Sequence, residues 1–139
     1  MTPIDASLID RKRSIMLREL KLLDELRRRK VRASSDIVLQ HALIHSLQNC
    51  ISAAIDIAQH VGVERTGEVA SSYAESIRML GELKVLSKKF AARFSEVAKL
   101  RNVLVHAYEN LDVDLVATMV PKFLKDAKVF LTAIKKLTS

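Results

Sequence analysis

Apolar residues recur every three or four positions along most of the chain, the spacing that places them on one face of an α-helix. Five stretches show this pattern: Asp5 to Arg32, Asp36 to about Gly62, Ser72 to Gly81, Ser87 to the Asn110-Leu111-Asp112 break, and Val113 to Leu137. Short loops between long amphipathic helices favour an antiparallel bundle. The pattern therefore predicts an all-α fold, an antiparallel bundle of about five helices.

Polar residues mark the expected ends of these helices. Asp36, after two serines, is a candidate N-cap for the second helix, and Ser72 with Glu75 has the spacing of a capping box. We expect the second helix to stop near Gly62, with a loop from Val61 to Gly67. Pro121 lies inside the last stretch and is expected to kink that helix, because it lacks a backbone N–H.

The composition agrees with a helical domain. The chain has 139 residues, of which 49% are hydrophobic, but only 3 Gly and 2 Pro. That is a poor supply for a fold with many tight turns, and the length suits one domain with a substantial core. We therefore expect a single domain spanning residues 1–139.

Charge and cysteine content bear on the partners and the cellular location of the chain. Lys and Arg number 23 against 16 Asp and Glu, a net charge of +7, which attracts polyanions such as nucleic acid, although basic helix faces are often merely solvated. The single cysteine, Cys50, has no internal disulfide partner. With neither a secretory leader nor a long apolar run, the chain is expected to be cytoplasmic, without membrane contact.

Two local clusters have ordinary structural explanations. The basic run Arg27 to Arg32 falls at the end of the first predicted helix, where cations interact favourably with the helix dipole. His41 and His45 are four residues apart and could bind a metal, but no third ligand lies nearby in the sequence. We therefore expect no metal site and no cofactor, and the role of the basic run stays open.

The most informative segment runs from Arg101 to Tyr108. Phe94, Arg101 and Tyr108 are spaced seven residues apart, so they lie nearly in line along one side of a helix. Asn102 and His106 are four residues apart and lie on a neighbouring line. An arginine on such an apolar stripe must be paired, hydrated in a cleft or placed at a subunit interface, because burying it unpaired is costly. In the ordinary alternative, Arg101 pairs with Glu82 or Glu96 on the bundle surface. His106 is then an ordinary histidine at a helix end, and Tyr108 caps the core.

The pattern Arg-Asn-x-x-x-His-x-Tyr at the end of a bundle helix resembles the signature of the HEPN superfamily. It is most similar to the HepT-like ribonuclease toxins, which are encoded beside a minimal nucleotidyltransferase antitoxin. The flanking segments agree: HALIHSLQNCISAAIDIAQHV resembles the second helix of that family, SSYAESIRMLGEL its short third helix, and RNVLVHAYENLDVDLV its motif and following helix. The resemblance covers about residues 36–134.

This resemblance implies an endoribonuclease toxin of a type VII-like toxin–antitoxin pair, cleaving RNA without a metal. Histidine acts as acid or base near neutral pH, and arginine clamps phosphate through two donors, so His106 and Arg101 are the expected catalytic residues. Asn102 is expected to orient His106 or bind the phosphate, and Tyr108 to stack on a base or hold the site. The resemblance also makes Tyr108 the residue to which the nucleotidyltransferase antitoxin attaches AMP.

One histidine and one arginine are few for acid, base and charge stabilisation together. A homodimer that joins two copies through the face of Phe94, Arg101 and Tyr108 would bring two sets to one cleft. Two other readings stay open: a non-catalytic HEPN subunit that presents substrate or nucleotide to a nucleotidyltransferase, and a helical interaction module without an active site. Intact Arg101 and His106 argue against the first of these.

Overall fold

The computed structural model describes residues 5–29, 36–106 and 110–138, and within these ranges every regular element is a helix. The helices are α1 (Ala6–Arg28), α2 (Ile37–Thr66), α3 (Tyr73–Glu82), α4 (Lys88–Phe94), α5 (Val97–His106) and α6 (Val113–Lys135). The predicted all-α bundle is confirmed. Side chains at the expected N-caps Asp36, Ser72 and Ser87 accept backbone N–H groups, as do those of Asp5 and Asp112.

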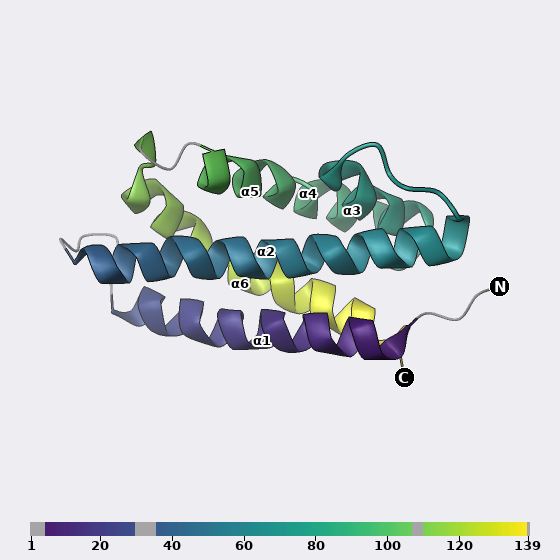
Figure 1. Cartoon of the computed structure of the whole chain (residues 1–139), viewed down its shortest axis with the longest axis horizontal. Coiled ribbons are helices and arrows are strands. Elements are labelled where there is room, and N and C mark those ends of the chain that lie inside the picture. The colour runs from purple at the N-terminus through teal and green to yellow at the C-terminus, as the bar shows by residue number, and fades with distance from the viewer. Residues whose placement is uncertain (1–4, 30–35, 107–109, 139) are drawn as a thin grey trace.

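The longest helix, α2, and the first helix, α1, lie antiparallel and side by side (Figure 1). On the opposite side of α2, the short helices α3 and α4 pack against each other and α5 continues beyond α4, while α6 returns behind α2 toward the start of α1. Helix α5 runs toward the end of the bundle at which α1 ends and α6 begins, and its last turn lies beside the first half of α2 (Figure 1). The motif helix therefore points toward the end of the molecule that carries the basic end of α1.

A cluster of phenylalanines ties α4 to α6. Phe94 is 1% exposed and stacks on Phe90, Phe123 and Phe130, with ring centroids 5.4, 6.5 and 5.1 Å away respectively. Such offset aromatic pairs add to the stabilisation from burying their area. The cluster therefore fixes the position of the end of α4 against α6, and with it the start of α5.

The end of α2 lies further along the chain than predicted. The helix passes through Gly62 and ends at Thr66, because Gly67 takes the left-handed conformation (φ 74°) that closes a helix, and its N–H donates to the Val63 carbonyl. Gly62 is buried instead, and a Cβ on it would lie 3.6 Å from Met79 of α3. The expected loop from Val61 was therefore wrong: of the two glycines, the second is the terminator.

This difference leads to a paired prediction for stability. Gly67→Ala should lower the free energy of unfolding by about 1–2 kcal/mol, because an L-residue in the left-handed region meets its own carbonyl. Gly62→Ala, whose new methyl would make only ordinary contact, should be neutral or stabilising by up to about 1 kcal/mol, since alanine favours a helix interior. Urea unfolding of both variants checks this; equal shifts for the two would contradict it.

The fourth predicted helix is divided in two. At Ser95 and Glu96 the backbone tightens: Glu96 N–H bonds the Arg93 carbonyl at 3.3 Å and Ala98 N–H bonds the Ser95 carbonyl at 3.1 Å, both with i to i−3 spacing. The Ser95 hydroxyl donates to the Ala92 carbonyl at 2.7 Å. Serine side chains compete with helical backbone bonds in this way, which explains why the helix is interrupted at Ser95. The apolar spacing in the sequence runs through this interruption unchanged, so the spacing alone predicted one helix.

The predicted helix through Pro121 is continuous in α6, with the proline exposed; a kink there stays a prediction. Two residues that we expected on the apolar, core-facing sides of their helices do not join the core: Ile37 is exposed at the start of α2, and Met119 is exposed on α6. Cys50 is fully buried in α2, and burial raises the pKa of its thiol to about 12, with a further contribution from the charge of Glu19. Among the described residues, no helix is both long and apolar enough to cross a membrane.

Candidate active site on helix α5

Helix α5 carries three of the four predicted site residues. Arg101 is half-buried, whereas Asn102 and His106 are exposed, and His106 is the last residue of the helix. Tyr108, the fourth, lies outside the described residues. Five residues of α-helix advance about 7.5 Å and turn about 140° between Arg101 and His106, so the two side chains leave the helix in different directions. One copy of α5 therefore presents the pair along its length rather than converging on a point.

The Arg101 guanidinium lies over an aromatic ring of a neighbouring helix. Its Cζ is 5.3 Å from the ring centroid of Tyr73, at the start of α3. This cation–π contact orients the group without neutralising its charge, so the donors remain available to a phosphate. Within the described ranges no carboxylate forms an ion pair with Arg101.

The ordinary alternative for Arg101 is therefore wrong. Glu82 lies 3.6 Å from Lys88, and Glu96 lies 3.4 Å from Lys99, both as ion pairs that leave Arg101 aside. Of the three possibilities for an arginine on this stripe, pairing with a carboxylate is therefore removed. The Arg101 guanidinium is either partly exposed at a cleft or placed at a subunit interface.

The predicted face of Phe94, Arg101 and Tyr108 is not formed as expected. Phe94 is buried among the other phenylalanines on α4, whereas Arg101 reaches α3 from α5. The tightened turn at Ser95 separates the two residues into different helices, so their spacing of seven no longer places them in line. An interface involving Arg101 cannot use Phe94 as a contact.

The last turn of α5 is held by a side chain from α2. Gln48 donates its Nε2 amide to the Leu104 carbonyl at 2.9 Å, and Leu104 itself is fully buried. The final carbonyls of a helix have no partner within it, so this bond satisfies one of them and fixes the turn that ends at His106. Sequence reasoning missed Gln48, whose one signal was an amide within the apolar run of α2.

A polar pocket opens between α5 and the start of α3. Its volume is about 390 Å³, and we call it the α3–α5 pocket. The polar side chains that line it are Gln59, Ser71, Ser72, Tyr73, Lys99 and Asn102. Tyr73 lines the pocket and also contacts Arg101, and so the pocket adjoins the predicted phosphate-binding group. Neither Gln59 nor Tyr73 was among the predicted site residues.

An apolar cleft lies on the other side of α5, against α6. It measures about 810 Å³, and its apolar lining includes Val97, Leu100, Val103, Leu111, Leu115 and Met119. Val103 is 46%, Leu115 54% and Met119 39% exposed. Large side chains left this open at one place are typical of a surface that another molecule covers. Helix α5 therefore separates a polar pocket from an apolar cleft.

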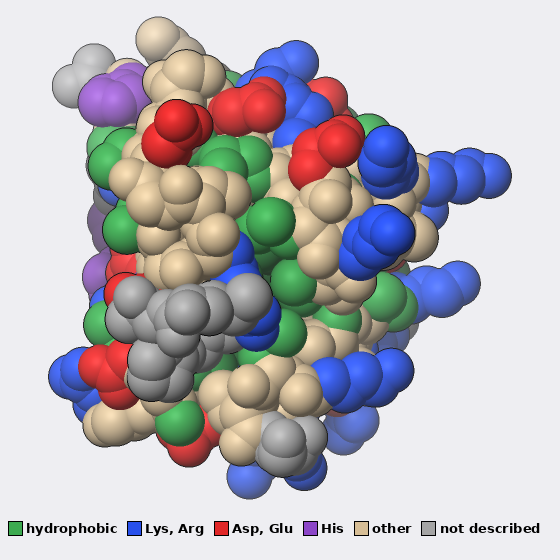
Figure 2. Space-filling model, turned by 90° about the vertical axis from the view of Figure 1, so that its right-hand side faces the viewer, with side chains coloured by type: hydrophobic (Ala, Val, Ile, Leu, Met, Phe, Trp, Pro, Cys, Tyr) green, Lys and Arg blue, Asp and Glu red, His purple; other side chains and the backbone are tan. Residues whose placement is uncertain are grey.

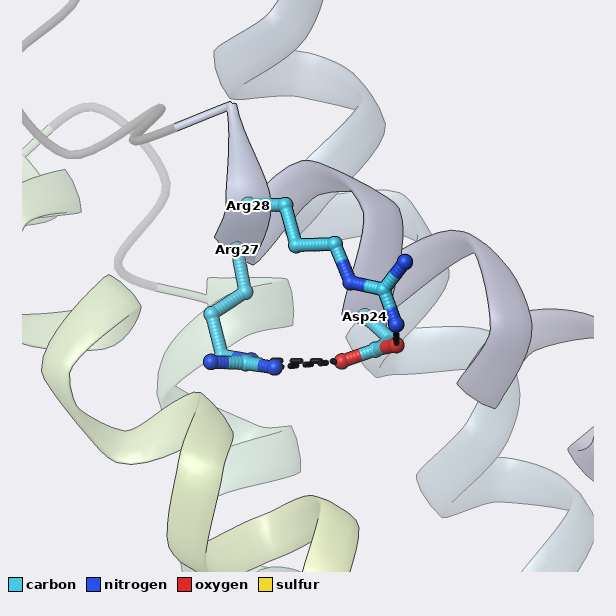
Figure 3. A network of polar contacts seen from close by, with 3 residues as sticks. All are labelled: Asp24, Arg27 and Arg28. Atoms are coloured by element: carbon cyan, nitrogen blue, oxygen red, sulfur yellow. Dashed lines mark hydrogen bonds and ion pairs between the residues drawn. The ribbon is translucent and has the colours of Figure 1, made fainter.

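The basic end of α1 is partly neutralised within its own helix. Asp24 accepts from Arg27 at 2.7 Å and from Arg28 at 2.8 Å, on different carboxylate oxygens (Figure 3). The hydrogen bond from Arg27 is the main cause that lowers the pKa of Asp24, with smaller help from the charge of Arg28. Arg29 pairs with Glu25 at 3.0 Å. The described part of this run is thus stabilised by ion pairs with acidic residues one turn earlier in the same helix, in addition to its position at the helix end.

Other basic side chains are spread over the surface. At the opposite end of the bundle, Lys and Arg side chains gather along the right-hand edge, while Asp and Glu side chains lie both near the top and toward the lower left of the view (Figure 2). Of the two histidines considered as metal ligands, His41 and His45, the second has another contact: a ring nitrogen of His45 lies 3.2 Å from the Asn49 amide. Among the residues that the structure describes, no three His, Cys, Asp or Glu side chains are placed to hold a metal ion.

The fold and the motif helix define a class before any comparison: a small helical bundle that presents an arginine and a histidine on one short helix, beside a polar pocket. Comparison with known proteins agrees. The family model described as Ribonuclease HepT-like matches residues 16–134. The chain belongs to this family, as the motif and its flanks predicted.

Named relatives and solved structures are similar along most of the chain. The mRNA nuclease HepT of Shewanella oneidensis is 31% identical over 100 residues, which cover 72% of this chain and 75% of that protein. A tri-AMPylated HEPN toxin of the same organism, solved in complex with its MNT antitoxin, superposes with a TM-score of 0.83 at 27% identity, covering 93% and 97% of the two chains. A toxin–antitoxin structure with AMP-PNP gives 0.81 at 26% identity, covering 91% and 97%.

Proposed function

We propose that this chain is an endoribonuclease toxin that cleaves RNA without a metal and is silenced by a nucleotidyltransferase antitoxin. The observation that carries the proposal is helix α5, which presents an un-neutralised Arg101 and an exposed His106 on the surface of a HepT-like fold. The mRNA nuclease named among its relatives and the toxin–antitoxin structures support it.

The proposed chemistry is transfer within the RNA backbone. His106 removes the proton from a 2′-hydroxyl, the 2′ oxygen attacks the adjacent phosphorus, and the 5′ oxygen of the next nucleotide leaves with a proton from a second acid. Arg101 stabilises the charge that builds on the phosphorane oxygens. The products are a 2′,3′-cyclic phosphate and a 5′-hydroxyl.

The purified chain should cut RNA in the presence of EDTA and leave these ends, because none of its described residues form a metal-binding group. Treatment with T4 polynucleotide kinase, with and without its phosphatase activity, followed by adaptor ligation identifies the ends. Cleavage that stops in EDTA and returns with a divalent ion, or that leaves a 3′-hydroxyl, would contradict the assignment of His106 as the base.

A second acid implies a second copy of the chain. Because Arg101 and His106 of one α5 point about 140° apart, one copy does not close both around a single phosphate. The apolar cleft beside α5, with Val103, Leu115 and Met119 exposed, offers the surface through which two copies would associate. We therefore propose a homodimer with a two-fold axis near α5, in which each site takes groups from both copies.

Sedimentation equilibrium should accordingly give about twice the mass of one chain at micromolar concentration. Leu115→Glu, which places a charge on the exposed wall of the cleft, should shift the protein to monomer and remove RNA cleavage together. Val129→Glu is the matched control on α6, because Val129 is similarly exposed but does not line the cleft. A monomeric wild type that still cuts RNA would remove the composite site.

The same proposal covers the partner, the modified residue and the location of the chain. The partner is a minimal nucleotidyltransferase antitoxin, Tyr108 is the acceptor of AMP, and Asn102 supports the site beside Arg101. The family match over residues 16–134 supports one domain for the whole chain. A buried free thiol at Cys50 and the absence of a membrane-spanning helix among the described residues are compatible with the cytoplasm as its location.

A further inference from the structure

We propose that the α3–α5 pocket binds one nucleobase of the RNA, next to the phosphate that Arg101 holds, and so sets the sequence at which the chain cuts. The inference rests on the proposed ribonuclease function. It starts from the position of the pocket, which shares Tyr73 with the Arg101 contact and is lined by Asn102, the neighbour of Arg101 in α5. A nucleotide whose phosphate lies at Arg101 thus has a pocket within reach of its base.

The size and the walls suit a flat heterocycle. A volume of about 390 Å³ falls within the usual range of small-molecule sites. Tyr73 is 40% exposed, so part of its ring surface remains open while the guanidinium lies over the ring. Proteins that read single-stranded RNA stack its unpaired bases on aromatic rings and on guanidinium planes. Tyr73 supplies such an aromatic surface in the pocket, beside the Arg101 guanidinium that holds the phosphate.

Two carboxamides provide the means to distinguish bases. Gln59 from α2 and Asn102 from α5 both line the pocket, and no hydrogen bond to another described residue engages either amide group. Each amide offers a donor and an acceptor side by side, which matches the paired donors and acceptors on the edge of a base. The hydroxyls of Ser71 and Tyr73 add further polar positions.

The charge of the pocket favours a base over a second phosphate. Lys99 is the only cation among its lining residues, and it pairs with Glu96 at 3.4 Å. The Arg101 guanidinium lies over the Tyr73 ring and is not itself part of the pocket wall. A neutral, hydrogen-bonding ring is therefore a better match for the pocket than an anion.

Cleavage of a randomised RNA pool, read by sequencing the new ends, tests the proposal. The wild type should prefer one or two bases beside the cut. Gln59→Ala should flatten that preference by about tenfold or more, while Tyr73→Ala should slow cutting of every sequence by roughly 5- to 100-fold, the effect of losing a stacking platform. Tyr73→Phe keeps the ring and should restore the rate. Val69→Ala, an exposed side chain of the same loop outside the pocket, should leave the profile unchanged.

Binding to the inactive His106→Ala protein separates this inference from the proposed function. Short RNAs that differ in one base should differ in affinity, an RNA lacking that base should bind about as weakly as the worst sequence, and Gln59→Ala should level the series. Failure of the wild type to cut RNA would sink the ribonuclease proposal but leave this comparison intact. A wild type without base preference, equal binding of the RNA lacking the base, or a profile unmoved by Gln59→Ala and Tyr73→Ala would overturn the base pocket.

Discussion

His106→Ala and Arg101→Ala should each abolish RNA cleavage and cellular toxicity, with the fold left intact. Losing a positioned acid or base typically reduces the rate by about 10²- to 10⁴-fold, and losing the cation at the phosphate should cost about as much. The structural cost should be small, because His106 is exposed and Arg101 is only half-buried, with a ring contact as its main interaction. Initial rates on a fluorogenic RNA measure cleavage, growth of cells that express each variant measures toxicity, and circular dichroism with sedimentation measures the fold and the assembly.

The chain supplies matched controls at the far end of α1. Arg11→Ala removes an exposed arginine, and His60→Ala removes a histidine whose one hydrogen bond among the described residues comes from the Asp5 N–H, so both should cut at the wild-type rate. If the two site variants fold normally and still cut RNA like these controls, the motif is not the active site. The reading as a non-catalytic subunit that presents substrate to a nucleotidyltransferase would then replace the ribonuclease.

Attachment of AMP should switch the toxin off at Tyr108. Co-expression with the nucleotidyltransferase antitoxin should add AMP to this phenol and lower RNA cleavage by at least about 100-fold, because a phosphate placed two residues beyond His106 would compete with RNA for the Arg101 cation. Mass spectrometry of tryptic peptides locates the adduct, and rate measurements on the same sample give its effect.

The only other tyrosine of the chain makes the test specific. Tyr73→Phe should still become modified and inactive, whereas Tyr108→Phe should stay unmodified and toxic in the presence of the antitoxin. Adducts on serine, threonine or Tyr73 alone, or an antitoxin that silences Tyr108→Phe equally well by binding, would rule out this switch.

Local patterns in the sequence predicted most of the fold, because helix starts and apolar faces depend on neighbours along the chain. Asp36, Ser72 and Ser87 each cap the helix expected of them. The errors fell where tertiary contacts decide. Gly62 and Gly67 look alike in sequence, and only the packing of Gly62 against Met79 shows which one ends the helix. Likewise, the tightened turn at Ser95 leaves the apolar spacing undisturbed.

The candidate site was predictable only in part for the same reason. Arg101, Asn102 and His106 stand out as a polar set within one apolar helix. Their supports come from other helices and from residue types that are common on any surface: Tyr73 of α3 lies under the guanidinium, and Gln48 of α2 bonds the last turn of α5. No spacing rule connects Gln48 with Leu104, 56 positions later, before the bundle is assembled.

The burial of Cys50 has a practical consequence. With its thiol enclosed at the centre of α2 and held in the protonated form, a reagent that attacks thiolates meets it only in molecules whose core has opened. The rate of alkylation at rising reagent concentration therefore separates the frequency of that opening from its equilibrium population. Every variant described above carries the same single thiol, so one labelling experiment ranks the stability of the toxin and its inactive forms without an added probe.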